Sequence, residues 1–173
     1  MRRALFLDRD GVINSEINYL HRIKDFEFID GIFKLCRHYQ DLGYIIIVVT
    51  NQSGIARSYY SESDFNLLTT WMIEEFANNG VEIKKVYFCP HHPDITGDCS
   101  CRKPHPGMLL DAAKEFDIDL KNSILIGDKE RDIEAALNAG VTNTYLFDES
   151  KIHKISKASK IISKLEDIYN VNT

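Results

Sequence analysis

The sequence has no long apolar run at its start. The stretch from Ala4 to Leu7 is apolar but is followed at once by Asp8. A secretory signal needs an apolar region of about 7–15 residues, and a helix that crosses a membrane needs about 20. We therefore expect a cytoplasmic protein that does not associate with a membrane.

The sequence also lacks a block of lysine and arginine beside its polar motifs. It contains 21 Lys and Arg against 26 Asp and Glu, which gives a formal net charge of −5. Binding nucleic acid without regard to its sequence requires a basic surface. We therefore expect no nucleic-acid partner and a small ligand instead. The lysines that follow Asp148 are predicted to form a solvated surface without a function of their own.

Cysteine is scarce, with four among 173 residues. Three of the four, Cys89, Cys99 and Cys101, lie close together in the sequence. In a reducing compartment, clustered cysteines are more often metal ligands than disulfide partners. The fourth, Cys36, lies in an apolar helical segment and is predicted to be a small buried hydrophobic residue.

The length of 173 residues and the hydrophobic content of 44% suit one compact core and are too small for two ordinary domains. We expect a single domain over residues 1–173 that is stable as a monomer. Short apolar runs alternate with amphipathic segments, with no internal repeat. We predict strands at 4–7, 44–49, 86–88, 123–126 and 144–147, and helices at about 31–42, 61–79, 106–117 and 130–139.

This alternation predicts an α/β fold: a Rossmann-like parallel sheet sandwiched by helices. Ligands of such sheets bind at the carboxyl ends of the strands. Three predicted strands are followed there by polar motifs, which are Asp8-Arg9-Asp10-Gly11, Thr50-Asn51-Gln52-Ser53-Gly54 and Gly127-Asp128-Lys129-Glu130-Arg131-Asp132. The long connection over residues 12–30 is predicted to be a flap beside the site.

Two carboxylates separated by one residue can divide the work of phosphoryl transfer. Asp8 fits the nucleophile and Asp10 the acid and base for the leaving group. An anionic phosphate needs a hard cation beside these carboxylates, such as Mg²⁺, for which Asp128 is a third oxygen donor and Asp132 a weaker one. Thr50 and Lys103 could meet the charge on the phosphoryl oxygens. The alternative is that these residues only cap helices and form turns.

A second group of residues has the composition of a zinc site. Cys89, His91, Cys99 and Cys101 together offer three thiolates and one imidazole, the ligand set of a closed, structural zinc site. His92 could replace His91, and free or redox-active thiols are the alternative reading. The loop over residues 89–101 leads directly into Arg102 and Lys103, so a fixed loop would also fix these two cations.

With the two aspartates at 8 and 10, Thr50, Lys103 and the motif at 127–132, the chain resembles the haloacid-dehalogenase superfamily of phosphatases over nearly its whole length. The segments 6–11, 50–57, 89–93 and 101–108 resemble one of its families, the bacterial phosphatases of heptose bisphosphate, which lack a large cap and carry a zinc loop beside the site. The resemblance implies that Asp8 is the nucleophile, that Asp10 is the acid and base, and that Mg²⁺ binds Asp8, Asp128 and the backbone of Asp10.

The same resemblance implies a phosphorylated sugar as substrate and nucleotide-activated heptose for surface polysaccharide as the pathway. The residues that match the family's substrate contacts are Glu16, Ile17, Asn18, Tyr19, Asn51, Gln52, Ser53, Arg102 and Lys129. Two features depart from the family: the spacer before Cys99 is short, and Ser58 stands where glycine is common. A histidinol-phosphate phosphatase is the rival enzyme, and a zinc-stabilised binding module is the alternative without catalysis.

Overall fold

The computed structural model describes residues 1–170 and contains one six-stranded sheet. Residues 171–173 of the predicted domain lie outside the described residues. The strands are β1 (Arg3–Leu7), β2 (Tyr44–Asn51), β3 (Ile83–Cys89), β4 (Ile124–Gly127), β5 (Asn143–Phe147) and β6 (Lys160–Ile162). The α-helices are α1 (Ile32–Asp41), α2 (Glu62–Asn78), α3 (Pro93–Thr96), α4 (Gly107–Phe116) and α5 (Glu130–Ala139), and the 3-10 helices are η1 (Ile23–Asp25), η2 (Leu120–Asn122) and η3 (Leu165–Ile168).

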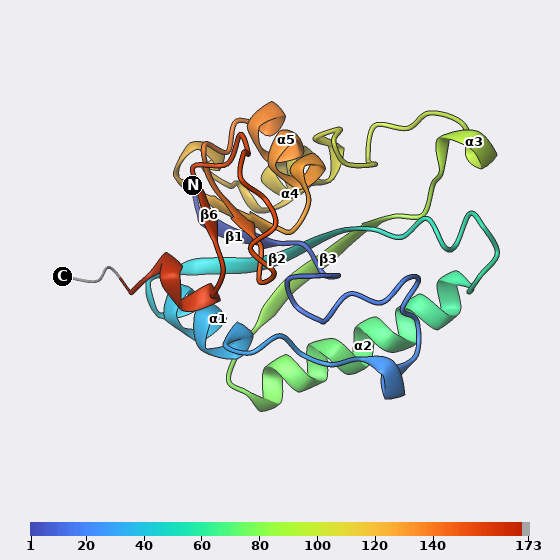
Figure 1. Ribbon diagram of the computed structural model, residues 1–173, viewed down its shortest axis with the longest axis horizontal. Helices are drawn as coiled ribbons and strands as arrows, with labels where there is room; N and C mark the ends of the chain where they lie inside the picture. The colour runs from blue at the N-terminus through green and yellow to red at the C-terminus, as the bar shows by residue number, and fades with distance from the viewer. Residues whose placement is uncertain (171–173) are drawn as a thin grey trace.

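The strand order is β3-β2-β1-β4-β5-β6, and every neighbouring pair is parallel. The chain builds outward from β1 through β2 to β3, then crosses back to place β4 on the other side of β1. This reversal makes the carboxyl ends of β1 and β4 the switch point at which such sheets bind ligands. The prediction of a parallel sheet with helices on both faces is confirmed (Figure 1).

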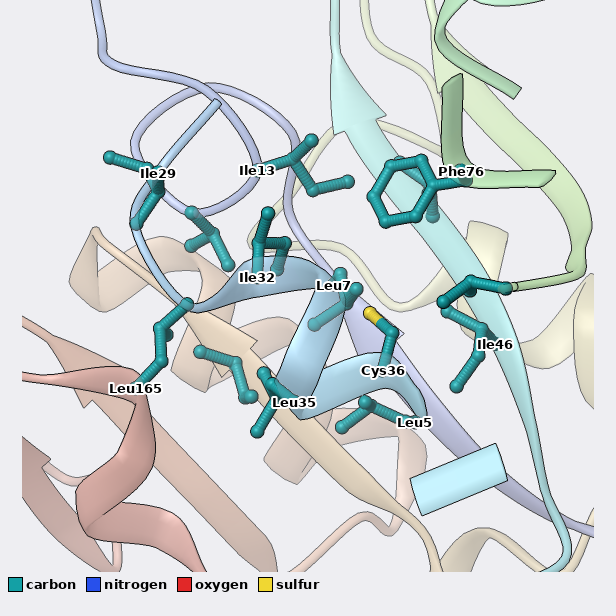
Figure 2. Packing of buried hydrophobic residues seen from close by; sticks show 14 of the residues in the cluster. Leu5, Leu7, Ile13, Ile29, Ile32, Leu35, Cys36, Ile46, Phe76 and Leu165 are labelled. Carbon is teal, nitrogen blue, oxygen red and sulfur yellow. The ribbon is translucent and has the colours of Figure 1, made fainter. Parts of the chain in front are cut away.

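The two faces of the sheet bury separate clusters of apolar side chains. Leu5 and Leu7 of β1 point to the face covered by α1 and α2, while Ala4 and Phe6 point to the face covered by α4 and α5. This alternation is the two-residue period of a strand. Figure 2 shows the first cluster, in which the Cys36 side chain lies among Leu5, Leu7 and Ile46. Cys36 is thus the buried hydrophobic residue that the sequence predicts.

The helix boundaries follow the capping signals in the sequence. Ser61 is the N-cap of α2: its hydroxyl accepts from the Asp64 N–H, and the Asp64 carboxylate accepts from the Ser61 N–H. This reciprocal pair satisfies two donors that a helix start leaves free. Gly140 ends α5 with a φ of 98°, a left-handed conformation that glycine adopts easily.

The prediction of five strands was wrong, because the tail adds a sixth. β6 pairs with β5, and Ile162, Leu165 and Ile168 are buried. The tail lysines are exposed as predicted, but the apolar residues between them close one edge of the sheet and pack beside α1. Within residues 1–170, no helix is long and apolar enough to cross a membrane.

Candidate active site and metal cluster

The buried ammonium group of Lys103 joins the carboxylates at the switch point. Its Nζ lies 2.8 Å from Asp8 Oδ1 and 2.7 Å from Asp132 Oδ1, and it donates to the Val49 carbonyl at 2.9 Å. Asp8 follows β1 directly and Asp132 lies in the first turn of α5. Because only about 2% of Lys103 is exposed, its charge acts on these groups with little screening by water.

Burial has opposite consequences for the acids and the lysine. Burial, then the neighbouring Asp132 carboxylate, raises the pKa of Asp8 well above its ordinary value, against the lowering effect of Lys103. The same two causes raise the pKa of Asp128 to about 6. Desolvation alone would lower the pKa of Lys103, but Asp132 and Asp8 outweigh it and raise that pKa.

Three crowded carboxylates face two ammonium groups, those of Lys103 and Lys129, so the site keeps an excess of negative charge. Asp8, Asp128 and Asp132 each place an oxygen within 4.8 Å of the others. A divalent cation with oxygen ligands would remove the repulsion between them and hold Asp8 ionised. The donor set therefore fits magnesium.

Asp10 is not one of these three carboxylates and has hydrogen-bond partners of its own. Its Oδ1 accepts hydrogen bonds from Arg9 at 3.2 and 2.9 Å and from Asn14 at 3.1 Å, and its Oδ2 accepts from Gln52 at 3.2 Å. Tyr60 in turn donates to Gln52 Oε1 at 2.5 Å. These contacts fix the orientation of the Asp10 carboxylate.

Gly11 allows the first and fourth strand ends to approach each other. Its φ is +88°, and a Cβ atom there would lie 2.2 Å from Asp128 Oδ2. A larger residue would therefore strain the backbone and displace the carboxylate of Asp128.

A cavity of about 320 Å³ opens above these groups, within the usual range for small-molecule sites. Of the predicted catalytic and metal residues, Asp8, Asp10, Lys103 and Asp128 line it, while Thr50 and Asp132 do not. All predicted substrate contacts line it: Glu16, Ile17, Asn18, Tyr19, Asn51, Gln52, Ser53, Arg102 and Lys129. Further lining residues that the sequence analysis did not single out for binding substrate are Gly54, Arg57, Tyr60, His92 and Arg131.

Thr50 is fully buried, and its hydroxyl accepts from Gln52 Nε2, a residue of the cavity lining, at 2.9 Å. The flap spans the cavity wall: Glu16 pairs with Lys129 at 3.0 Å, and Lys129 also contacts Asp128 at 3.1 Å. The Tyr19 ring packs edge-on against Tyr59 with centroids 4.6 Å apart. The predicted flap thus joins two other loops around the site.

The predicted zinc ligands form a compact group. His91 Nδ1 lies 3.6 Å from Cys89 Sγ and 3.3 Å from Cys101 Sγ, and Cys99 Sγ lies 3.6 Å from each of the other two sulfurs. These four side chains could hold one metal ion, and three thiolates with an imidazole suit zinc. His92 is not among them, because its ring faces Arg57 instead.

The loop over residues 89–101, called the metal loop below, is hydrogen-bonded on both sides to the end of β2 and the turn after it. Asn51 and the Lys103 backbone exchange two hydrogen bonds, at 3.2 and 3.0 Å, and the Gln52 N–H donates to the Cys89 carbonyl at 2.8 Å. An ordered loop therefore fixes both the lysine and the turn after β2.

Comparison with known proteins gives the family. The chain is 54% identical to the D-glycero-alpha-D-manno-heptose-1,7-bisphosphate 7-phosphatase of Campylobacter jejuni over 86% of this chain and 84% of that protein. It is 46% identical to the corresponding beta-heptose enzyme of Pasteurella multocida over 87% of this chain and 84% of that one. The chain belongs to this family of phosphatases. Residues 100–150 also match the family described as HAD-hydrolase-like, so the predicted superfamily is confirmed.

Solved structures agree with this assignment. The D,D-heptose 1,7-bisphosphate phosphatase of B. bronchiseptica, complexed with magnesium and phosphate, superposes with a TM-score of 0.85 at 27% identity, over 96% of this chain and 95% of that one. A HAD-like phosphatase of Mesorhizobium loti gives a TM-score of 0.86 at 32% identity, over 96% of this chain and 84% of that one.

Ser58, at the position where the family resemblance leads us to expect glycine, has a φ of 57°. This left-handed conformation explains why glycine suits the position, since it adopts positive φ without a steric cost. Arg9, Asn14 and Tyr60 are the supporting residues that sequence reasoning missed. Only the position of Arg9, between the two aspartates of the first motif, could have suggested a role.

Proposed function

We propose that the protein is a Mg²⁺-dependent phosphatase that removes the 7-phosphate of D-glycero-D-manno-heptose 1,7-bisphosphate through an aspartyl-phosphate on Asp8. The observation that carries the proposal is the placement of Asp8, Asp10, Lys103 and Asp128 in one cavity at the switch point. Sequence identity of 54% to a phosphatase of this substrate supports the choice of sugar. The pathway would be the supply of nucleotide-activated heptose for bacterial surface polysaccharide.

In the first step, an Asp8 oxygen attacks the phosphorus and the bond from phosphorus to the sugar oxygen breaks. Asp10 gives a proton to that leaving oxygen. In the second step, Asp10 takes a proton from a water molecule that attacks the phosphorus of the aspartyl-phosphate, which releases phosphate and restores Asp8. Lys103 neutralises charge on the phosphoryl oxygens throughout, since it reaches Asp8 at 2.8 Å.

Magnesium, when bound, would lower the repulsion between Asp8 and the incoming phosphate. Asp8 and Asp128 would hold it with their carboxylates and Asp10 with its backbone carbonyl, and Asp132 is the weaker candidate. We propose zinc for Cys89, His91, Cys99 and Cys101, where it would stabilise the loop rather than take part in the reaction. Reduced thiols suit the proposed cytoplasmic location, and we propose that the enzyme acts as a monomer.

The experiment is phosphate release with Mg²⁺ from both anomers of the heptose bisphosphate, with histidinol phosphate in parallel. Hydrolysis of a bisphosphate anomer with the higher kcat/KM is expected, and the preferred anomer would be read from the same data. A preference for histidinol phosphate would overturn the substrate and keep the mechanism.

Asp8→Asn tests the proposed nucleophile, because this change removes the reacting carboxylate and keeps the shape of the side chain. Turnover should fall by at least about 10³-fold, with an unchanged circular dichroism spectrum and zinc content. Full activity in this variant would exclude Asp8 as nucleophile. A zinc-stabilised binding module would release no phosphate even as wild type.

A further inference from the structure

Arg57 is a cavity residue that takes no part in the proposed reaction steps. It lies in the turn after β2 and lines the cavity. Its Nη2 lies 2.9 Å from His92 Nε2, and since a guanidinium group can only donate, the imidazole nitrogen accepts. The Arg57 Nε–H is buried and has no hydrogen-bond partner within the described residues. A buried donor without a partner is costly, so a bound acceptor would satisfy it.

Arg102 contacts His91, which precedes His92 in the same loop. Its Nη1 donates to the His91 carbonyl at 3.3 Å, while Arg57 contacts the ring of His92. The two guanidinium groups come from segments far apart in sequence but are attached to consecutive residues of the metal loop, and both line the cavity. Within residues 1–170, neither forms an ion pair with a carboxylate.

The positive charge of this pair is separate from that of Lys103. Lys103 is paired with Asp8 and Asp132. Its charge therefore lies next to the proposed nucleophile, where the transferred phosphoryl group would bind. The charges on Arg57 and Arg102 have no such partner, so the cavity offers cationic groups for a second anion. Planar guanidinium groups bind phosphate through paired hydrogen bonds.

We propose that Arg57, positioned by His92, binds the phosphate of the substrate that is not transferred and thereby selects sugar bisphosphates over monophosphates. This inference rests on the proposed function and adds to it a residue and a source of selectivity. It also gives the metal loop a second role, because His91 is a proposed metal ligand and the next residue orients a substrate-binding arginine.

The test compares kcat/KM for heptose 1,7-bisphosphate with that for heptose 7-phosphate, which lacks the second phosphate. The wild type should prefer the bisphosphate by about tenfold or more. Arg57→Ala should lower kcat/KM for the bisphosphate by about 10- to 100-fold, the range for a lost charged hydrogen-bonding group, and change that for the monophosphate less than about twofold. Arg57→Lys, which keeps the charge but loses the planar fork, should fall between these limits.

His92 is tested as a positioning residue. His92→Ala should raise KM for the bisphosphate severalfold with little change in kcat, and His92→Gln, which retains an acceptor, should restore part of the loss. Bound zinc is measured in each variant so that a disrupted loop is recognised. Arg37→Ala is the matched control, because this arginine lies on α1 and contacts Asn79 away from the cavity; both rates should stay unchanged.

Equal losses on the two substrates in Arg57→Ala and Arg57→Lys would overturn the inference, as would a wild type with no preference for the bisphosphate. Either result leaves the phosphatase assignment intact. If the wild type released phosphate from neither sugar, the proposed function itself would fall.

Discussion

Lys103 bridges two of the three carboxylates at the switch point. It contacts Asp8 at 2.8 Å and Asp132 at 2.7 Å, and Asp132 is about 1% exposed and outside the cavity lining. This geometry favours a supporting role for Asp132, in which it holds the ammonium group against Asp8, over direct binding of magnesium. Its oxygen is nevertheless close enough to Asp8 and Asp128 to share an ion with them.

Asp132→Asn separates these two roles. If Asp132 positions Lys103, kcat should fall by about 10- to 100-fold, the usual loss for a supporting partner of a site, while the Mg²⁺ concentration that gives half-maximal rate changes less than about twofold. The measurement is a magnesium titration of phosphate release at saturating substrate. A large increase in that concentration would show instead that Asp132 binds the ion.

Asp8 and Asp128 could be predicted because each directly follows a strand, where the fold places ligands. The partners of Asp10 could not, because their contacts depend on how the turn after β1 directs each side chain. The hydrogen bond between Arg57 and His92 spans 35 residues, and no local pattern in the sequence marks such a pair. The sequence therefore indicated the aspartates that line the cavity and did not indicate the supporting contacts of Arg9, Asn14 and Tyr60.

The metal loop is the element on which several parts of the site depend. The loop begins at Cys89, the last residue of β3, whose carbonyl accepts a hydrogen bond from the turn after β2. The loop is followed directly by Arg102 and Lys103. Zinc in such a site contributes free energy of folding. The loop should therefore lose its order when the metal is removed, and the substrate-binding groups should lose their positions with it.

Removal of zinc by a strong thiol-compatible chelator, followed by gel filtration and re-addition of Mg²⁺, should lower the melting temperature and reduce kcat/KM for the bisphosphate by at least about tenfold. Added zinc should restore both. Cys99→Ser should show the same loss without a chelator, whereas Cys36→Ser tests a buried cysteine outside the loop and should retain zinc. Full activity in a chain shown to be free of zinc would contradict this dependence.

Helices were easier to predict than the last strand. The capping pair of Ser61 and Asp64 and the left-handed Gly140 mark helix ends by local chemistry, and such signals are contained in a few adjacent residues. β6 has three residues, Lys160–Ile162, which is too short for a two-residue period to be recognised among lysines. Its strand conformation depends on pairing with β5, a contact that the local sequence does not encode.

At the scale of the whole molecule, the tail completes the fold on the side of the sheet away from the metal loop. β6 covers β5, and η3 places Leu165 and Ile168 against the core that includes α1. Figure 1 shows the tail beside α1, while α3 of the metal loop lies at the far end of the molecule. Stability and catalysis should therefore be separable by mutations in the tail.

Leu165→Ala tests this separation. Leu165 is about 2% exposed, and removing a buried leucine side chain costs about 2–5 kcal/mol because it loses apolar contacts and leaves a cavity. For a chain of this size, that loss should lower the melting temperature by roughly 5–15 °C, while kcat and KM at 25 °C stay within about twofold. Leu67→Ala on α2 is the control, since 65% of that side chain is exposed and its loss should change neither property. Thermal and urea unfolding, followed by circular dichroism, measure the stability; an unchanged melting temperature would show that the tail adds little to the fold, and a parallel fall in kcat would show that the two ends of the sheet are coupled.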